Sequence, residues 1–156
     1  MVYGVTKAME RVDAFLYKDR NGVIVKHDRL IPSFTDLRPG SDLFYIVTVE
    51  AGEDPEEFCR RAKARSAEQT GFITSGDWAE DELVYFTCLP WFPVTAFTNE
   101  RDLNPSDSVP RASWGRWRQE GDRYLLDLSL ELNHRLLDGV HVGEFYDELT
   151  RWINSL

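Results

Sequence analysis

Cysteine is nearly absent from this sequence, and the two that it has, Cys59 and Cys88, form neither a metal-binding spacing nor a disulfide framework. There is no run of 18 apolar residues, so no membrane-spanning helix is expected, and the N-terminus lacks the basic-then-apolar order of a signal peptide. Positive charge is also scarce. With 18 Lys and Arg against 27 Asp and Glu, the net charge of -9 disfavours nucleic acids and anionic membranes as main partners. These absences predict a cytoplasmic protein.

The sequence does contain enough apolar material for a packed core. Its 156 residues are 42% hydrophobic and 13% aromatic, which suits one domain over residues 1–156. Apolar residues at helical spacing predict helices over 3–13 and 141–154. A third helix is predicted from Asp54 to about Gly71, because Asp54 can cap it, Pro55 suits the first helical position and Glu57 completes a capping box. Apolar runs between turn signals predict a hairpin around Asn21-Gly22 and strands over 43–50, 83–98, 112–118 and 123–133. The pattern indicates an α+β fold in which helices pack on one side of an antiparallel-rich mixed sheet.

The end of the last predicted strand carries the first candidate for chemistry. Its leucines share one face, and Asp127, Ser129 and Glu131 take the other. If the extended geometry continues, His134 lies on the leucine face, where desolvation favours the neutral imidazole that a general base needs. The alternation fits a buried histidine that bonds a backbone carbonyl as well, and taken alone it favours that second interpretation.

The residues that follow this strand favour a catalytic role for His134 over a structural one. Residues 134–141 read HRLLDGVH, which resembles the active-site motif of the chloramphenicol acetyltransferase family, where Asp-Gly begins four residues after the catalytic histidine. The family has two adjacent histidines, of which the second is catalytic; here the first is Asn133 and the second is His134. Three more segments resemble the family in the same order along the chain: residues 31–35, 89–91 and 113–117.

This resemblance implies a CoA-dependent acyltransferase fold and an antibiotic-resistance enzyme. Acetyl would pass from acetyl-CoA, as co-substrate, to a hydroxyl of chloramphenicol or a similar small hydroxylated molecule, with His134 as general base. Thr87 stands where the family has a serine that donates to the oxyanion, although threonine is equally ordinary in a strand. Ser113 matches a family threonine that holds a water near the tetrahedral intermediate.

Other positions follow from the same resemblance. Trp117 and Pro90 correspond to positions beside the CoA adenine, although Trp117 without the family would simply suggest sheet packing. Phe44 and Tyr85 correspond to the acceptor pocket. Asp138 corresponds to a carboxylate that fixes the histidine loop by pairing with an arginine near the family's N-terminus.

The resemblance begins inside the family's second helix, so we expect an N-terminally shortened member without the first strand, the first helix and that arginine. Arg135 and Arg111 are then the candidates to pair with Asp138, because an unpaired buried carboxylate is unfavourable. No metal is expected, since His27, His134 and His141 lack acidic ligands at suitable spacing. His141 is expected to cap or pack against the start of the last helix.

The family is trimeric with its active site between subunits, so a homotrimer is expected. Two other interpretations stay open. One is a catalytically degenerate relative that serves as a trimeric binding or assembly module, which CoA binding without turnover would favour. The other is the catalytic domain of a dihydrolipoyl acyltransferase, whose motif also resembles the segment from His134 to Gly139, although no lipoyl domain or linker is visible.

Overall fold

The computed structural model describes residues 1–74, 76–100 and 104–156. Its main sheet has the strand order β4-β3-β5-β6-β9, with β3–β5 and β5–β6 parallel and the outer pairs antiparallel. The strands, in chain order, are β3 (Ile31–Leu37), β4 (Phe44–Thr48), β5 (Leu83–Leu89), β6 (Arg111–Gly115) and β9 (Leu128–Glu131). Separate hairpins are formed by β1 (Tyr17–Arg20) with β2 (Val23–Lys26) and by β7 (Arg118–Glu120) with β8 (Arg123–Leu125).

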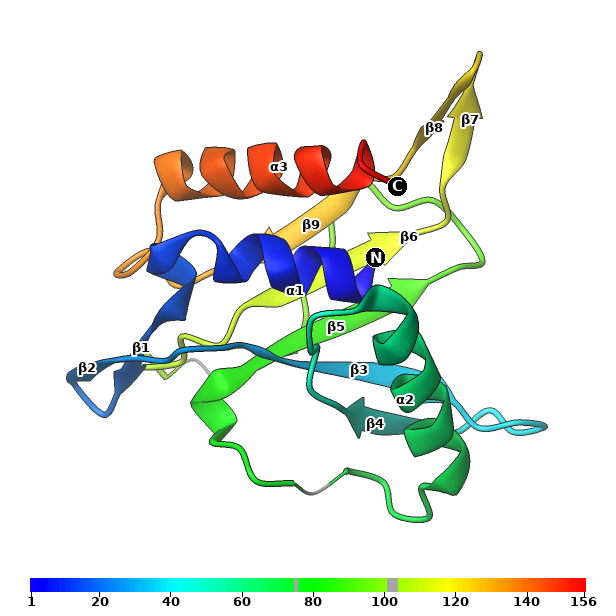
Figure 1. The fold of residues 1–156 in the computed structure, drawn as a ribbon, viewed down its shortest axis with the longest axis horizontal. Coiled ribbons are helices and arrows are strands. Elements are labelled where there is room, and N and C mark those ends of the chain that lie inside the picture. The colour runs from blue at the N-terminus through cyan, green and yellow to red at the C-terminus, as the bar shows by residue number, and fades with distance from the viewer. Residues whose placement is uncertain (75, 101–103) are drawn as a thin grey trace.

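Helices cover one face of this sheet, with α1 and α3 lying side by side across it (Figure 1). They are α1 (Val2–Glu10), α2 (Pro55–Glu68) and α3 (Gly139–Ile153), and short 3-10 turns span Asp13–Leu16 and Glu80–Glu82. Val5 and Met9 of α1 and Phe145 of α3 are fully buried against Val84 and Phe86 of β5. The predicted α+β class, with a mixed sheet and helices on one side, is confirmed.

Local signals placed several elements correctly. The Asp54 carboxylate caps α2 by accepting a hydrogen bond from Glu57 N at 2.6 Å, and Pro55 fills the first helical position. Asn21 and Gly22 both have positive φ, 54° and 87°, which is the backbone that a tight two-residue hairpin needs. The last helix starts two residues earlier than predicted because Asp138 acts as its cap.

The predicted strand over 123–133 is wrong as a single element, since it is split into β8 and β9. The chain changes partner at this point: β8 pairs with β7 in a hairpin that projects from the sheet, and β9 pairs with β6 (Figure 1). The predicted strand over 112–118 is likewise divided between β6 and β7, and the run over 83–98 is a strand only to Leu89. Pro90 lacks the N–H that would continue the ladder.

Lys18 is a charged residue in the core. Its side chain is fully buried in β1, and the nearest bonded atom, Ser108 O, lies 3.5 Å from its Nζ. Burial lowers the pKa of Lys18 to about 7, with the negative charge of Asp81 opposing the shift. The folded protein therefore holds fewer protons than the unfolded chain between about pH 7 and the ordinary lysine value of 10.5.

We expect the contribution of Lys18 to stability to rise with pH through this window, because burying the neutral amine is less unfavourable than burying the ammonium. Lys18→Met should stabilise the protein by about 1–3 kcal/mol at pH 6, with a smaller gain at pH 9. Urea unfolding at the two pH values measures this difference, with Lys63→Met at an exposed position of α2 as the control. A gain that grows with pH would contradict the prediction.

Candidate active site

Three hydroxyl side chains lie in a row on the sheet face away from the helices. Thr87 of β5 pairs in register with Ser113 of β6, which pairs with Ser129 of β9. Because side chains alternate along a strand and Phe86 and Trp114 face the core, Thr87 and Ser113 must face the other way. The segment from Phe97 to Glu100 crosses this face, and Ser129 Oγ donates to Phe97 O at 3.1 Å.

Asn99 connects the hydroxyls of this row. Thr87 Oγ1 donates to Asn99 Oδ1 at 3.4 Å, and Asn99 Nδ2 donates to Ser113 Oγ at 3.2 Å. Glu131 Oε2 accepts from Asn99 Nδ2 at 2.6 Å and from Asn99 N at 2.8 Å. Because a carboxylate only accepts hydrogen bonds, Glu131 fixes the orientation of the Asn99 side-chain amide. The amide nitrogen faces Glu131 and Ser113, and the amide oxygen faces Thr87. Ser113 accepts from Asn99 and keeps its own proton for another partner.

Thr87 and Ser113 were predicted as site residues from the family resemblance, whereas Asn99 was not noticed and Glu131 was given no role. Glu131 could have been noticed, because it lies on the polar face of the alternating strand three residues before His134. Asn99 carries no local signal, since it lies in an irregular segment after two prolines. Its place depends on the non-local pairing of β5, β6 and β9.

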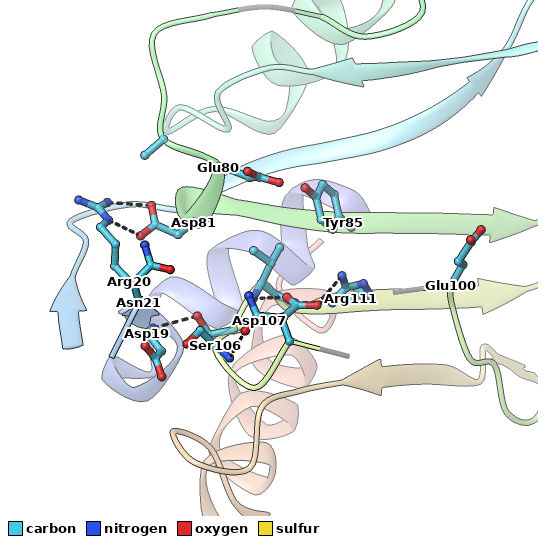
Figure 2. A pocket seen from close by; sticks show the side chains of 14 residues that line it. Asp19, Arg20, Asn21, Glu80, Asp81, Tyr85, Glu100, Ser106, Asp107 and Arg111 are labelled. Atoms are coloured by element: carbon cyan, nitrogen blue, oxygen red, sulfur yellow. Dashed lines mark hydrogen bonds and ion pairs between the residues drawn. The ribbon is translucent and has the colours of Figure 1, made fainter. Parts of the chain in front are cut away.

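Tyr85 lies two residues before Thr87 on the same face and lines a depression of about 1000 Å³ (Figure 2). Arg111 stands over the Tyr85 ring, with its guanidinium carbon 5.5 Å from the ring centroid. Burial raises the pKa of the Tyr85 phenol; the charge of Glu80 adds to this shift and that of Arg111 opposes it.

Phe44 lies apart from this depression. It is exposed at the start of β4, two strands from Thr87, and its ring stacks at a tilt on that of Phe72 with centroids 5.5 Å apart. The structure therefore brings Tyr85, but not Phe44, next to the row of hydroxyls.

His134 is not on a strand, so the prediction of a histidine held on the leucine face is wrong for the single chain. The strand ends at Glu131, and Asn133 O accepts from Leu136 N and Leu137 N, which forms a turn. His134 is exposed in this turn. Its ring still borders apolar side chains, because it lines an open depression of about 420 Å³ with seven other residues: Leu130, Leu132, Leu137, Asp138, Gly139, Val142 and Tyr146.

Asp138 acts as a helix cap. Its Oδ1 accepts from Val140 N at 3.0 Å, and its N–H donates to His141 Nδ1 at 3.1 Å, which confirms the capping expected of His141. The expectation that Arg135 or Arg111 pairs with Asp138 is wrong: Arg135 pairs with Asp19, and Arg111 with Asp107. The Asp138 side chain is 54% exposed, so water can solvate it without a cation.

Pro90 and Trp117 follow the same end of the paired strands β5 and β6. Leu89 pairs with Gly115, so the residues that follow each strand leave the sheet side by side. Pro90 is exposed, and Trp117 is 56% exposed with its ring edge-on to Tyr124, centroids 5.0 Å apart. Trp117 therefore packs within the β7–β8 hairpin rather than into the main sheet.

Within one chain, His134 is far from Thr87. Thr87 is level with Ser129, and β9 runs from Ser129 away from Thr87 and past Glu131 before it reaches His134. At about 3.3 Å per residue, the separation along the strand direction is about 10 Å or more. The single chain thus holds a partly buried row of hydroxyls at one place and an exposed imidazole at another.

No helix among the described residues is both long and apolar enough to cross a bilayer. Within residues 1–74, 76–100 and 104–156, no group of three or more His, Cys, Asp or Glu is arranged to hold a metal ion.

Comparison with known proteins shows which family the chain resembles in sequence and in fold. The sequence model of the family described as chloramphenicol acetyltransferase matches residues 1–150. The chain is 26% identical to chloramphenicol acetyltransferase 3 of Escherichia coli, over 99% of this chain and 74% of the relative, and 25% identical to a chloramphenicol acetyltransferase of Campylobacter coli, over 99% and 76%. A solved chloramphenicol acetyltransferase has the same fold, with a TM-score of 0.77 at 20% identity, over 94% of this chain and 72% of that one.

A probable dihydrolipoamide acetyltransferase from Listeria monocytogenes also shares the fold, with a TM-score of 0.65 at 16% identity, over 99% of this chain and 68% of that one. Both kinds of solved neighbour are acetyltransferases by name. The fold is therefore that of the CoA-dependent acyltransferases, as the sequence predicted.

We expect Asn99→Ala to destabilise the protein by about 1–3 kcal/mol, because the Glu131 carboxylate and the two hydroxyls lose their shared partner. Glu131→Gln keeps an acceptor oxygen for Asn99, and its effect should stay under about 1 kcal/mol. Urea unfolding of the two variants and the parent measures the difference. Equal stability of Asn99→Ala and the parent would mean that water replaces the network at no loss.

Proposed function

The chain belongs to the chloramphenicol acetyltransferase family, and from this premise we propose that it transfers acetyl from acetyl-CoA to a hydroxyl of chloramphenicol or a similar small molecule. The observation that carries the proposal is the in-register pairing of Thr87 with Ser113, two residues along β5 from Tyr85, which lines the depression. These are the positions at which the family has its oxyanion donor, its water-holding hydroxyl and its acceptor pocket.

In the proposed reaction, the acceptor oxygen attacks the thioester carbonyl carbon while the His134 imidazole accepts the hydroxyl proton. The carbonyl oxygen becomes an oxyanion, and the Thr87 hydroxyl donates to it. To do so, Thr87 gives up its bond to Asn99 Oδ1, which at 3.4 Å is long and weak. Collapse then breaks the carbon–sulfur bond, releases the acetyl ester, and returns the proton from His134 to the CoA sulfur.

Acetyl-CoA is assigned to the end of β5 and β6, where the exposed Trp117 indole offers a flat aromatic surface to the adenine and the exposed Pro90 ring adds an apolar one. The acceptor is assigned to the opposite side of Thr87, in the depression lined by Tyr85 and Arg111. Phe44 lies outside that depression in the single chain, so its role in acceptor binding requires a contribution from elsewhere, such as a neighbouring copy. Asp138 acts through the start of α3 and does not touch the reacting atoms.

Since one chain leaves His134 and Thr87 apart, we propose that the complete site contains His134 from one copy and Thr87 from another, in the trimer typical of this family. The exposure of His134 in the single chain supports this assignment, because a base that faces a neighbouring copy must lie on the surface of its own.

We therefore expect light scattering to give about 54 kDa, three times the 18.1 kDa chain. A mass of one chain for an active enzyme would contradict the shared site. A multi-megadalton particle would favour the second interpretation, an acyltransferase core of the dihydrolipoyl type.

His134→Ala should lower the rate of CoA thiol release with chloramphenicol at least about a hundredfold, the low end expected for loss of a general base. The assay compares the parent and the variant over a panel of hydroxylated antibiotics, with CoA binding measured separately to check that the variant still binds it. Equal rates in the two proteins would refute the role of His134. Tight CoA binding by a parent without turnover would favour a degenerate relative.

A further inference from the structure

The two residues on either side of His134 are fixed by hydrogen bonds and an ion pair. Before it, Asn133 Nδ2 donates to two backbone oxygens, Pro105 O and Asp107 O, both at 2.9 Å. After it, Arg135 Nη1 lies 2.5 Å from Asp19 Oδ2. The two flanks are also joined to each other, because Arg135 N donates to Asn133 Oδ1 at 3.0 Å. The described structure shows no hydrogen bond made by the imidazole of His134.

Asp19 is the fixed end of this arrangement. Its side chain is only 1% exposed, whereas that of Arg135 is 59% exposed. Its Oδ1 accepts from Gly22 N at 2.6 Å, inside the β1–β2 turn, and its N–H donates to Ser108 Oγ at 2.9 Å. Figure 2 shows Asp19 beside Ser106 at the edge of the depression.

Three segments far apart in sequence therefore meet at one carboxylate: the turn of the β1–β2 hairpin, residues 104–108, and the turn that carries His134. The two ends of the Asp19–Arg135 pair are 116 residues apart in the chain. A buried carboxylate that has lost its cation is strongly unfavourable, so the guanidinium of Arg135 is drawn to one position. This constrains the backbone next to His134 without any contact to the imidazole.

We propose that Asp19, Arg135 and Asn133 are positioning residues, which together fix the turn that presents His134. The proposal rests on the proposed function for its catalytic consequence, but the anchoring of the turn can be measured without activity. These residues act through the backbone of His134 and touch no reacting atom. A general base must lie within hydrogen-bond reach of the proton that it removes, so movement of this turn by about 1 Å is enough to lower the rate.

The experiment compares Arg135→Gln, Asp19→Asn and the double variant in the full chain. Hydrogen exchange of the amides of residues 132–138 is measured first, followed by kcat and KM with acetyl-CoA and chloramphenicol. Arg135→Gln leaves the buried Asp19 carboxylate without its cation, whereas Asp19→Asn removes that charge altogether, so Asp19→Asn keeps the test valid if Arg135→Gln fails to fold. The control is the Arg29→Gln, Glu50→Gln double variant, which removes a surface arginine–carboxylate pair of 2.8 Å elsewhere.

We expect exchange of the segment 132–138 to rise at least about tenfold in each single variant, and kcat to fall about 10–100-fold while KM for acetyl-CoA stays within about twofold. The double variant should be no worse than the poorer single one, because both changes remove the same pair. Arg135→Lys should recover part of kcat. The control should change neither the exchange nor kcat.

Unchanged exchange in Arg135→Gln would overturn the proposal, as would raised exchange with unchanged kcat, or an equal loss in the control. If the parent releases no CoA thiol with any acceptor, the proposed function fails, and the exchange result alone then decides whether Asp19 anchors the turn.

Discussion

The position of β6 between β5 and β9 determines most of what this molecule can do. Its parallel pairing with β5 brings Thr87 level with Ser113, and its antiparallel pairing with β9 brings Ser129 level with both. The same pairing directs the end of β9 away from Thr87, toward the start of β6. One strand register therefore gathers the hydroxyls on the face away from the helices and directs the chain that leads to His134 toward the opposite end of the sheet. A slip of one residue in either pairing would turn these polar side chains into the core.

Asp19 and Asp138 are carboxylates in different surroundings, one buried and one exposed, and only the buried one needs a cation as partner. Asp19 is buried and holds both a backbone N–H and a guanidinium, and the bond from Gly22 N–H is the main reason that its pKa lies below the usual range. Asp138 is exposed and caps a helix, where water and the positive end of the helix dipole stabilise it. An arginine partner was expected for Asp138, but it is Asp19 that pairs with an arginine, Arg135. Burial, rather than position in a motif, determines which acid requires a cation.

Sequence reasoning succeeded where the signal was local. The cap at Asp54-Pro55 and the turn at Asn21-Gly22 depend on neighbouring residues, and both form as predicted. The leucines of β9 also share one face, packed against the core, although the strand is shorter than predicted. The break between β8 and β9 was not predicted, because it arises where the chain changes its pairing strand from β7 to β6. The alternation of apolar residues along a sequence carries no information about which strand it pairs with. The Asn99 network and the Asp19–Arg135 pair join distant segments and leave no pattern in the chain. For Thr87, Ser113 and His134, the assignment came from the family resemblance rather than from the residues alone.

The anchoring of Asn133 and Arg135 bears on how the proposed site is completed. To reach Thr87 within one chain, His134 would have to move about 10 Å or more, estimated from about 3.3 Å per strand residue. Such a movement would break both bonds of Asn133 and leave the Asp19 carboxylate buried without its cation. Association of a second copy needs none of these losses, because the turn already presents an exposed imidazole beside a partly apolar depression. The interactions that hold His134 away from its own Thr87 are thus the ones that favour its use by a neighbour.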